Sequence, residues 1–292
     1  MQIKSKALKH FFMMLAGKIN RPLYEKLRFR IMRGWWPNIY APTTINEWLL
    51  RRKISKKYEK AELSGAIESY RYIKSKGGVK VPNVLAVILD TNSRAHFDNL
   101  ADGSYILKGS HGSGMIKSFE ILEHVPDIPY EELNQLIDDW LIKDYADICG
   151  EYCYKSAVPA VLIEKSLTGG NGLALDIKVH CASGVPRILQ FLDRRAGNLK
   201  RFTWKIGTDA SITKIDMFKG ELDSEPDISH SLLDEAVTLA GSLSDGMEYV
   251  RVDFMISDND LYFGEFTFFP AGACMPLKNR SADIEFLSLC GL

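Results

Sequence analysis

The fold class is decided by Tyr249-Val250-Arg251-Val252-Asp253-Phe254-Met255-Ile256 and Leu261-Tyr262-Phe263-Gly264-Glu265-Phe266-Thr267-Phe268. Both segments are rich in aromatic and β-branched residues, which favours two strands joined through Asp258-Asn259-Asp260. A three-residue turn pairs residue 257 with 261 and therefore Asp253 with Glu265, and this register keeps the apolar residues on one face. Two opposite carboxylates have Cβ atoms about 4.5–5.5 Å apart, close enough to hold hard cations. The alternative is a solvated polar face on which Arg251 balances both acids.

Further strands and helices are predicted around this hairpin. Apolar runs indicate strands at 84–89, 105–108, 160–164, 173–181, 186–192 and 200–206. Helical periodicity marks 45–76, 129–146 and 231–242. Because the strands do not alternate with single helices, an α+β fold around an antiparallel sheet is favoured over a doubly wound parallel sheet. We expect a basic helical N-terminal region at 1–78, a small lid subdomain at 79–157 and a larger β-rich body with the metal site at 158–292.

The composition is that of an ordinary globular protein. Among 292 residues, 46% are hydrophobic and 25% are charged, which excludes a disordered chain, a collagen-like fibre and a coiled coil. The longest apolar run near the start, 11–17, is shorter than the roughly 18–20 residues that span a bilayer, and no signal-peptide cleavage site follows it. Five scattered cysteines are typical of a reduced protein, so we expect a cytoplasmic location.

The balanced net charge conceals a strong asymmetry along the chain. Residues 1–60 contain 15 Lys and Arg but three acidic residues, whereas the remainder contains 22 basic and 34 acidic residues. A basic arm on an acidic body predicts an anionic partner, either an acidic glycan or the inner face of a membrane rather than nucleic acid. The apolar residues of the arm stand at loosely helical spacing; they are Leu8, Phe11, Phe12, Leu15, Leu23, Leu27 and Ile31. The arm is therefore either an interfacial amphipathic helix or a helix packed on the acidic body.

A Gly-Ser loop follows the predicted strand that ends at Lys108. The loop reads Ser110-His111-Gly112-Ser113-Gly114 after Gly109. Glycines allow backbone N–H groups to wrap an anion, and a lysine beside them adds positive charge. The loop lacks the GK[ST] ending of a Walker motif, and the same residues also suit an ordinary turn.

A third set of charges lies on the predicted strands of the body. Asp176 and Lys178 share one face of a strand, and Arg194 and Arg195 follow the next strand. Together they are expected to line a cleft for an anionic substrate, although surface strands also carry such charges. No histidine pair has metal-ligand spacing, and no G-x-S-x-G motif occurs in the sequence. These absences argue against a zinc hydrolase and a serine-hydrolase triad.

Seven short motifs, taken in order, resemble the ATP-grasp superfamily and most closely its TupA-like branch, which is associated with teichuronopeptide and other surface-polysaccharide assembly. They are PTTINE (42–47), YILKGSHGSG (105–114), IEKSL (163–167), DIK (176–178), DR (193–194), YVRVDF (249–254) and FGEFTFFP (263–270). The resemblance covers roughly residues 42–276. It implies an ATP-grasp fold with a helical N-terminal arm.

The resemblance also implies how ATP is bound. Lys108 would contact the α- and β-phosphates, and Lys178 would be a further phosphate contact. The lid over the β- and γ-phosphates would consist of Ser110, His111, Gly112, Ser113 and Gly114. The hinge that reads adenine would use backbone groups and the carboxylate of Glu164, with Lys165 and Leu167 beside it.

The resemblance assigns the metal and the transferred phosphoryl group to the hairpin. Asp253 and Glu265 would hold Mg²⁺, while Arg251 together with Lys178 would stabilise the phosphoryl group. Thr267 stands where many members place an asparagine ligand. The chain departs from the branch at 62–65, where an Asp-Lys pair is usual, and at 150–155, where an aromatic motif is altered. An acceptor site different from that of better-known relatives is therefore expected.

ATP-grasp members resemble one another in chemistry: a carboxylate attacks the γ-phosphate, and an amine then displaces phosphate from the acylphosphate to form an amide. The resemblance implies a ligase that joins an amino acid or amine to a uronic acid of a bacterial surface polysaccharide, such as a capsule, or of its nucleotide-sugar precursor. Two alternatives remain open, namely a phosphotransferase that uses the same site and a non-catalytic nucleotide-binding scaffold of glycan assembly.

Overall fold

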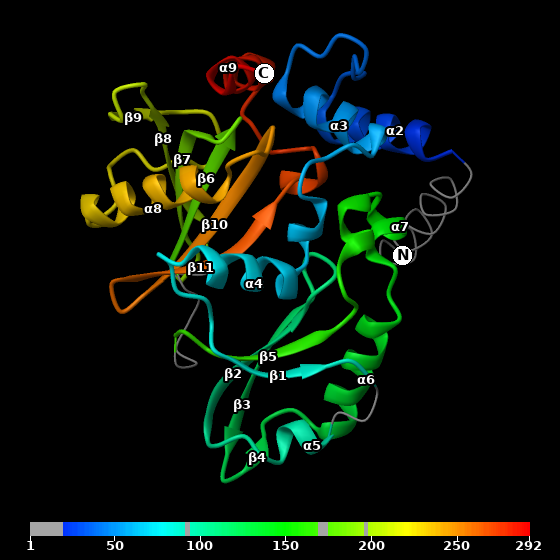
Figure 1. Ribbon diagram of the computed structural model, residues 1–292. Helices are drawn as coiled ribbons and strands as arrows, with labels where there is room; N and C mark the ends of the chain where they lie inside the picture. Colours follow the sequence, from blue (N-terminus) through cyan, green and yellow to red (C-terminus); the bar gives the residue numbers. More distant parts are fainter. Residues whose placement is uncertain (1–19, 91–93, 169–174, 196–197) are drawn as a thin grey trace.

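The structure, a computed structural model, describes residues 20–90, 94–168, 175–195 and 198–292 and has two lobes, each built on an antiparallel sheet (Figure 1). The α+β class predicted from the sequence is confirmed. Helix α4 (Ala66–Lys76) lies between the lobes, because its Tyr70 contacts strands of both sheets. The apolar residues of the arm at 8–15 lie outside the described residues.

The smaller lobe holds a five-stranded sheet in the order β1-β5-β2-β3-β4. Its strands are β1 (Val84–Ile88), β2 (Gly103–Gly109), β3 (Ile116–Leu122), β4 (Val125–Pro126) and β5 (Val161–Lys165). Short helix α5 (Arg94–Phe97) follows β1. Helix α6 (Tyr130–Leu141) buries Leu133, Ile137 and Trp140 against this sheet. The chain then passes through α7 (Tyr145–Cys149) and the 3₁₀ helix η2 (Tyr152–Ser156) before β5 re-enters the sheet beside β2.

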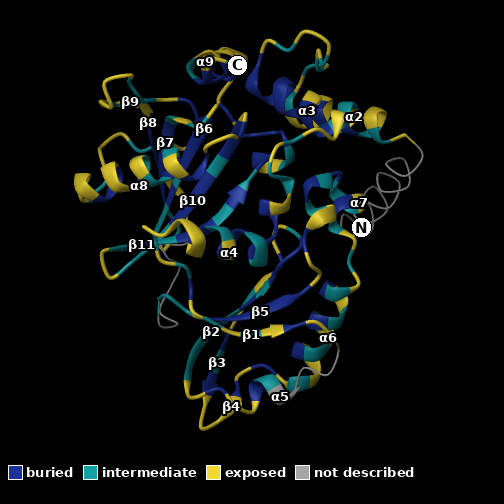
Figure 2. Ribbon diagram, in the orientation of Figure 1, coloured by how far each residue is buried: buried dark blue, intermediate teal, exposed yellow. Residues whose placement is uncertain are grey.

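The larger lobe holds a six-stranded sheet in the order β11-β10-β6-β7-β8-β9. Its strands are β6 (Leu175–Ala182), β7 (Val185–Asp193), β8 (Lys200–Ile206), β9 (Ile212–Ile215), β10 (Tyr249–Ser257) and β11 (Asp260–Thr267). Helix α8 (His230–Leu243) packs on one face through Leu233 and Ala236, whereas α3 (Ile45–Ser55) and α9 (Arg280–Cys290) pack on the other. The sheet is thus largely buried, as Figure 2 shows.

The hairpin of β10 and β11 pairs Asp253 with Glu265 as predicted, but the predicted three-residue turn is wrong. The turn has two residues, Asp258 and Asn259, whose φ angles of 51° and 62° are those of a type I′ turn. This turn pairs residue 256 with 261, and a β-bulge beside Gly264 then moves the register by one residue. Leu261 and Phe263 therefore face the core before the bulge, and Tyr262 does not.

The N-terminal region is a series of separate helices. Helix α2 (Arg21–Arg33) begins at Asn20, whose side chain accepts from the N–H of Leu23, and packs on α3 through the fully buried Phe29. The helix predicted over 45–76 is interrupted by Lys56 and Lys60, which have positive φ, and by the 3₁₀ helix η1 (Ala61–Ser64). No helix among the described residues is long and apolar enough to cross a membrane.

Candidate functional site

A cavity of about 370 Å³, here called the interlobe pocket, lies between the two sheets. It brings together most of the residues that the sequence predicted. They are Lys108, Ser113, Gly114, Glu164, Lys165, Leu167, Asp176, Lys178, Arg194, Asp253 and Glu265. Ile106, Phe254 and Met255 add apolar surface. The pocket thus combines an apolar wall with charged groups, as is usual for a small-molecule site.

Lys108 is held in the interlobe pocket by a buried hydrogen-bond network. Its Nζ donates to the Tyr70 hydroxyl (2.9 Å) and to the Gly264 carbonyl (3.0 Å), and the Tyr70 hydroxyl donates to Glu164 Oε1 (2.8 Å). Burial lowers the pKa of Lys108, but Tyr70 and Glu164 outweigh it, so the pKa lies above its usual value. Lys108 is therefore a fixed cation. The Glu164 carboxylate is 4% exposed and engaged by Tyr70, so the backbone of 164–167 is the part of the hinge open to a ligand.

Asp253 is flanked by two cations on the paired strands β6 and β10. Lys178 lies opposite it, and its Nζ donates to Asp253 Oδ2 at 2.5 Å. Arg251 donates through Nε and Nη2 to Oδ1 and Oδ2, both at 2.6 Å. Burial raises the pKa of Asp253, but Arg251 and Lys178 outweigh this effect and hold the pKa below its usual value. The carboxylate is consequently ionised throughout the neutral range.

Glu265 is the more accessible member of the carboxylate pair. Its side chain is 41% exposed, Oε1 accepts from the Thr267 hydroxyl at 2.9 Å, and Arg251 Nη2 lies 3.9 Å away. Within the described ranges, no group of three or more His, Cys, Asp and Glu side chains could hold a metal alone. Two carboxylates that line a pocket together with lysine side chains fit Mg²⁺, which commonly takes one or two carboxylates together with phosphate oxygens and waters.

The predicted lid loop is anchored at its base and open at its tip. Ser110 is buried, and its N–H donates to the Ala160 carbonyl (2.8 Å); His111 is also buried and its Nε2 bonds to the Trp140 carbonyl (3.0 Å). Gly112 lies against Tyr145, where a Cβ would meet Cγ at 2.7 Å. Ser110, His111 and Gly112 do not line the interlobe pocket, whereas Ser113 and Gly114 do.

The predicted substrate residues divide into two groups. Arg194 lines the interlobe pocket and forms an ion pair with Asp176. Arg195 instead bonds to Asp193, is 56% exposed and lies outside the linings of both cavities described here. The structure therefore places Asp176 and Arg194 beside Lys178, but not Arg195.

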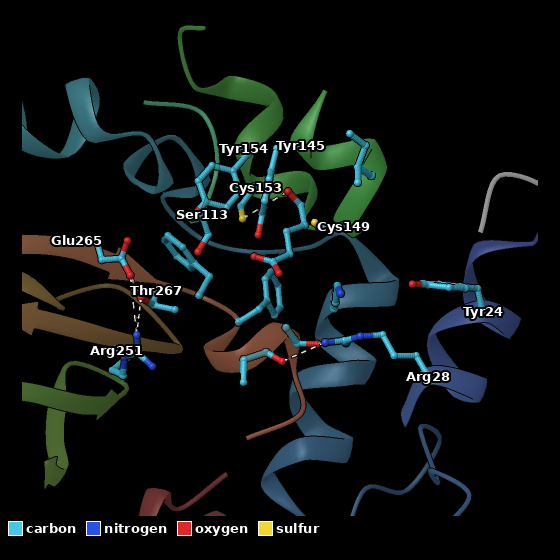
Figure 3. A pocket seen from close by; sticks show the side chains of 17 residues that line it. Tyr24, Arg28, Ser113, Tyr145, Cys149, Cys153, Tyr154, Arg251, Glu265 and Thr267 are labelled. Carbon is cyan, nitrogen blue, oxygen red and sulfur yellow. Dashed lines mark hydrogen bonds and ion pairs between the residues drawn. The ribbon is translucent and has the colours of Figure 1, made fainter. Parts of the chain in front are cut away.

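A second cavity, of about 410 Å³ and here called the α2 pocket, adjoins the first. Both linings include Ser113 and Glu265. Among its other residues are Tyr24, Arg28, Lys53, Tyr145, Cys149, Glu151, Tyr154 and Arg251. Figure 3 shows Glu265, Thr267 and Arg251 on the side of the sheet, and Tyr24 and Arg28 on α2 at the opposite side. Tyr24, Arg28, Lys53 and Glu151 were not predicted as site residues from the sequence; the altered motif at 150–155 was the available signal.

A family model described as TupA-like ATPgrasp matches residues 46–287. The chain belongs to the TupA-like ATP-grasp family. The resemblance carried by the seven motifs is thereby confirmed. For this TupA-like ATP-grasp protein, helix α2 precedes the matched region, so Tyr24 and Arg28 of the α2 pocket lie outside it.

Solved structures similar to this TupA-like protein include ATP-grasp enzymes. The D-alanine–D-alanine ligase from Bacillus anthracis complexed with ATP is 13% identical, with a TM-score of 0.39 and coverage of 71% of this chain and 54% of the ligase. The D-alanine–D-alanine ligase from Helicobacter pylori is 14% identical, with a TM-score of 0.43 and coverage of 79% and 58%. The chain therefore spans a little over half of these two ligases. A comparison with curated proteins found no match.

Proposed function

We propose that this TupA-like ATP-grasp protein is an ATP-dependent carboxylate–amine ligase. The observation that carries the proposal is the meeting of Lys178, Arg251, Asp253 and Glu265 where the interlobe pocket adjoins the α2 pocket. A nucleotide in the first cavity then presents its terminal phosphate to a substrate in the second. Membership of the ATP-grasp family supports this use of the two cavities.

The residues of the interlobe pocket fit ATP and Mg²⁺. The adenine ring would lie against Ile106, Phe254 and Met255 and bond to the hinge backbone. Lys108 and Lys178 would hold the phosphates, together with the backbone of Ser113 and Gly114. Asp253 and Glu265 would hold Mg²⁺, which neutralises phosphate charge when bound.

The catalytic contribution of the chain is positioning and charge stabilisation. A substrate carboxylate attacks the γ-phosphate, and negative charge shifts onto oxygen atoms beside Arg251 and Lys178. Fixed cations that are already paired need little reorganisation as this charge develops. Closure of the loop tip at Ser113 excludes water, which would otherwise hydrolyse the acylphosphate. An amine then displaces phosphate and forms the amide.

The carboxylate donor proposed here is a uronic acid of a bacterial surface polysaccharide, such as a capsule, or of its nucleotide-sugar precursor. Arg194 on the interlobe pocket supports an anionic substrate, since guanidinium groups bind carboxylates with matched geometry. The exposed basic residues among the first 60, such as Arg30, Arg51 and Lys57, would help to hold an acidic glycan or the inner face of the membrane. The enzyme would act in the cytoplasm.

The test is Mg²⁺-dependent ADP release by the full chain, with uronic acids as donors and hydroxylamine as a generic amine. We expect donor-dependent ADP and hydroxamate in the wild type and a loss of about 100-fold or more in Glu265→Gln and Asp253→Asn. Glu235→Gln, an exposed glutamate on α8, is the matched control and keeps full activity. ADP without hydroxamate would instead identify a phosphotransferase. ATP binding without turnover would identify a non-catalytic scaffold.

A further inference from the structure

The α2 pocket contains a buried carboxylate that the proposed phosphoryl transfer does not use. Glu151 follows α7, lines this cavity and is 8% exposed. Within the described part of the chain, no residue donates a hydrogen bond to this carboxylate or forms an ion pair with it. Burying a charge without a partner is costly, so an unpaired carboxylate that faces a cavity indicates a ligand that supplies the partner.

An excess of positive charge lies at the α2 end of the same cavity. Glu25 is 2% exposed and is the acid shared by three cations. Lys53 Nζ lies 3.1 Å and Arg28 Nη1 3.7 Å from its Oε2, while Arg21 Nε lies 3.3 Å from Oε1. Since Arg28 and Lys53 also line the cavity, this end attracts an anionic group of a ligand.

Glu151 is influenced by charges at both ends of the cavity. Burial raises the pKa of its carboxyl to about 7; Lys53 and Arg28 oppose this rise, whereas Glu25 and Glu265 add to it. A group with a pKa near neutrality can take a proton from a substrate and release it again. Glu151 therefore feels both the cations at the α2 end and Glu265 at the reacting end of the cavity.

We propose that the α2 pocket binds the amine-bearing substrate as a zwitterion, with its carboxylate toward Arg28 and Lys53 and its ammonium group at Glu151. The inference rests on the proposed ligase function and names the second substrate class. In the coupling step Glu151 accepts one proton from the ammonium group. The amine nitrogen then bonds to the acyl carbon, the acyl carbon–oxygen bond to phosphate breaks, and phosphate leaves with the second proton of the nitrogen as hydrogen phosphate. An α-amino acid carries both charged groups and suits a cavity of about 410 Å³.

Helix α2 contributes Tyr24 and Arg28 to the α2 pocket. Tyr24 and Arg28 precede the region matched by the family model, which begins at residue 46. Arg28 is fixed by bonds from its Nη1 to the Gly272 carbonyl (2.7 Å) and from its Nη2 to the Ala271 carbonyl (3.2 Å). A donor fixed by backbone carbonyls loses little side-chain entropy on binding a ligand.

The test compares a neutral amine with zwitterionic amines in wild-type protein, Glu151→Gln and the control Glu235→Gln. Hydroxylamine carries no ammonium charge at neutral pH, so Glu151→Gln should form hydroxamate at a rate within about twofold of the wild type. With L-amino acids as amines, the same variant should show an amino-acid KM raised about tenfold or more, while its KM for ATP with hydroxylamine as the amine is unchanged. On the wild type, the amide of the best amino acid should also need about tenfold more substrate, because it lacks the carboxylate.

Each result assigns the failure to one of the two proposals. Hydroxamate formation by the wild type without coupling of any L-amino acid would overturn the zwitterion pocket and leave the ligase function standing. An unchanged amino-acid KM in Glu151→Gln, or an equal loss with hydroxylamine, would also overturn it. If the wild type releases no donor-dependent ADP with either amine, the ligase function fails and the inference fails with it.

Discussion

The hydroxyl of Tyr70 is expected to be a major source of stability between the two lobes. It accepts from Lys108 and donates to Glu164, so it connects α4 to β2 and β5, while its ring packs edge-on against Phe263 of β11 at 6.2 Å. Tyr70→Phe removes both hydrogen bonds and keeps the ring contact. Hydrogen bonds to charged groups contribute about 1.5–3 kcal/mol each. Lys108 keeps its bond to the Gly264 carbonyl, but Glu164 stays buried without this donor. We therefore expect a loss of about 3 kcal/mol in the free energy of unfolding.

The same helix provides the control for this substitution. Tyr72 is also on α4 and packs edge-on against Phe266 at 6.1 Å, but its hydroxyl makes one long bond of 3.4 Å to the Leu243 carbonyl. Tyr72→Phe should cost no more than about 0.5 kcal/mol. Urea unfolding monitored by tryptophan fluorescence measures both variants, with the slope required to match the wild type. Equal stabilities for the two variants would refute the view that Tyr70 connects the lobes.

Three further perturbations test the electrostatics and the turn. His180 is fully buried, and burial, followed by Arg251, lowers its pKa from 6.5 to about 3, so the unfolded chain takes up a proton that the folded protein excludes. The free energy of unfolding should then fall by about 1.4 kcal/mol per pH unit as the pH is lowered from 6.5 toward 3. Denaturant titrations at several pH values should find a shallower dependence of stability on pH in His180→Gln. An identical dependence would contradict this. Asn259→Gly in the type I′ turn should raise the free energy of unfolding by about 0.5–1 kcal/mol and so raise the thermal midpoint. A lowered midpoint would argue against the turn. Lys178→Met should reduce ADP release by about 100-fold or more while leaving far-UV circular dichroism unchanged, and wild-type turnover would exclude Lys178 from phosphoryl transfer.

The hairpin shows what a local sequence pattern can predict. Alternation of apolar and polar residues correctly placed Asp253 opposite Glu265, because one face of the sheet must be buried. The predicted loop length was wrong because two arrangements give the same pairing of Asp253 with Glu265. One is a three-residue turn, and the other is a two-residue turn followed by a bulge. Asp258 and Asn259 form a two-residue turn, and Gly264 absorbs the extra residue in a bulge. The Asp-Asn pair was a turn signal available in the sequence, because both residue types tolerate positive φ.

The interlobe pocket was largely predictable, whereas the α2 pocket was not. The residues of the first cavity lie in short motifs on strands or their ends, so neighbouring strands bring them together. The second cavity combines Arg28 of α2, Lys53 of α3 and Glu151 after α7. These residues are separated by many positions along the chain, and no periodic pattern relates helices packed on different lobes. Glu151 is also unremarkable in sequence; its burial near a cationic cluster is what marks it.

Ser113 and Glu265 line both cavities, so the affinities for ATP and for the amino acid should be coupled. Glu265 is open to each cavity, and Ser113 is at the tip of a loop whose base is fixed by Ser110 and His111. Mg²⁺ and ATP together carry a net negative charge, so their binding beside Glu265 attracts the ammonium group of an amino acid at Glu151. Nucleotide binding therefore strengthens the binding of an amino acid whose ammonium group lies at Glu151. By reciprocity of linkage, an amino acid bound at Glu151 should strengthen ATP binding by the same factor. Equilibrium titration of ATP with and without the amino acid measures that factor, and equal ATP affinities would show that the cavities act independently.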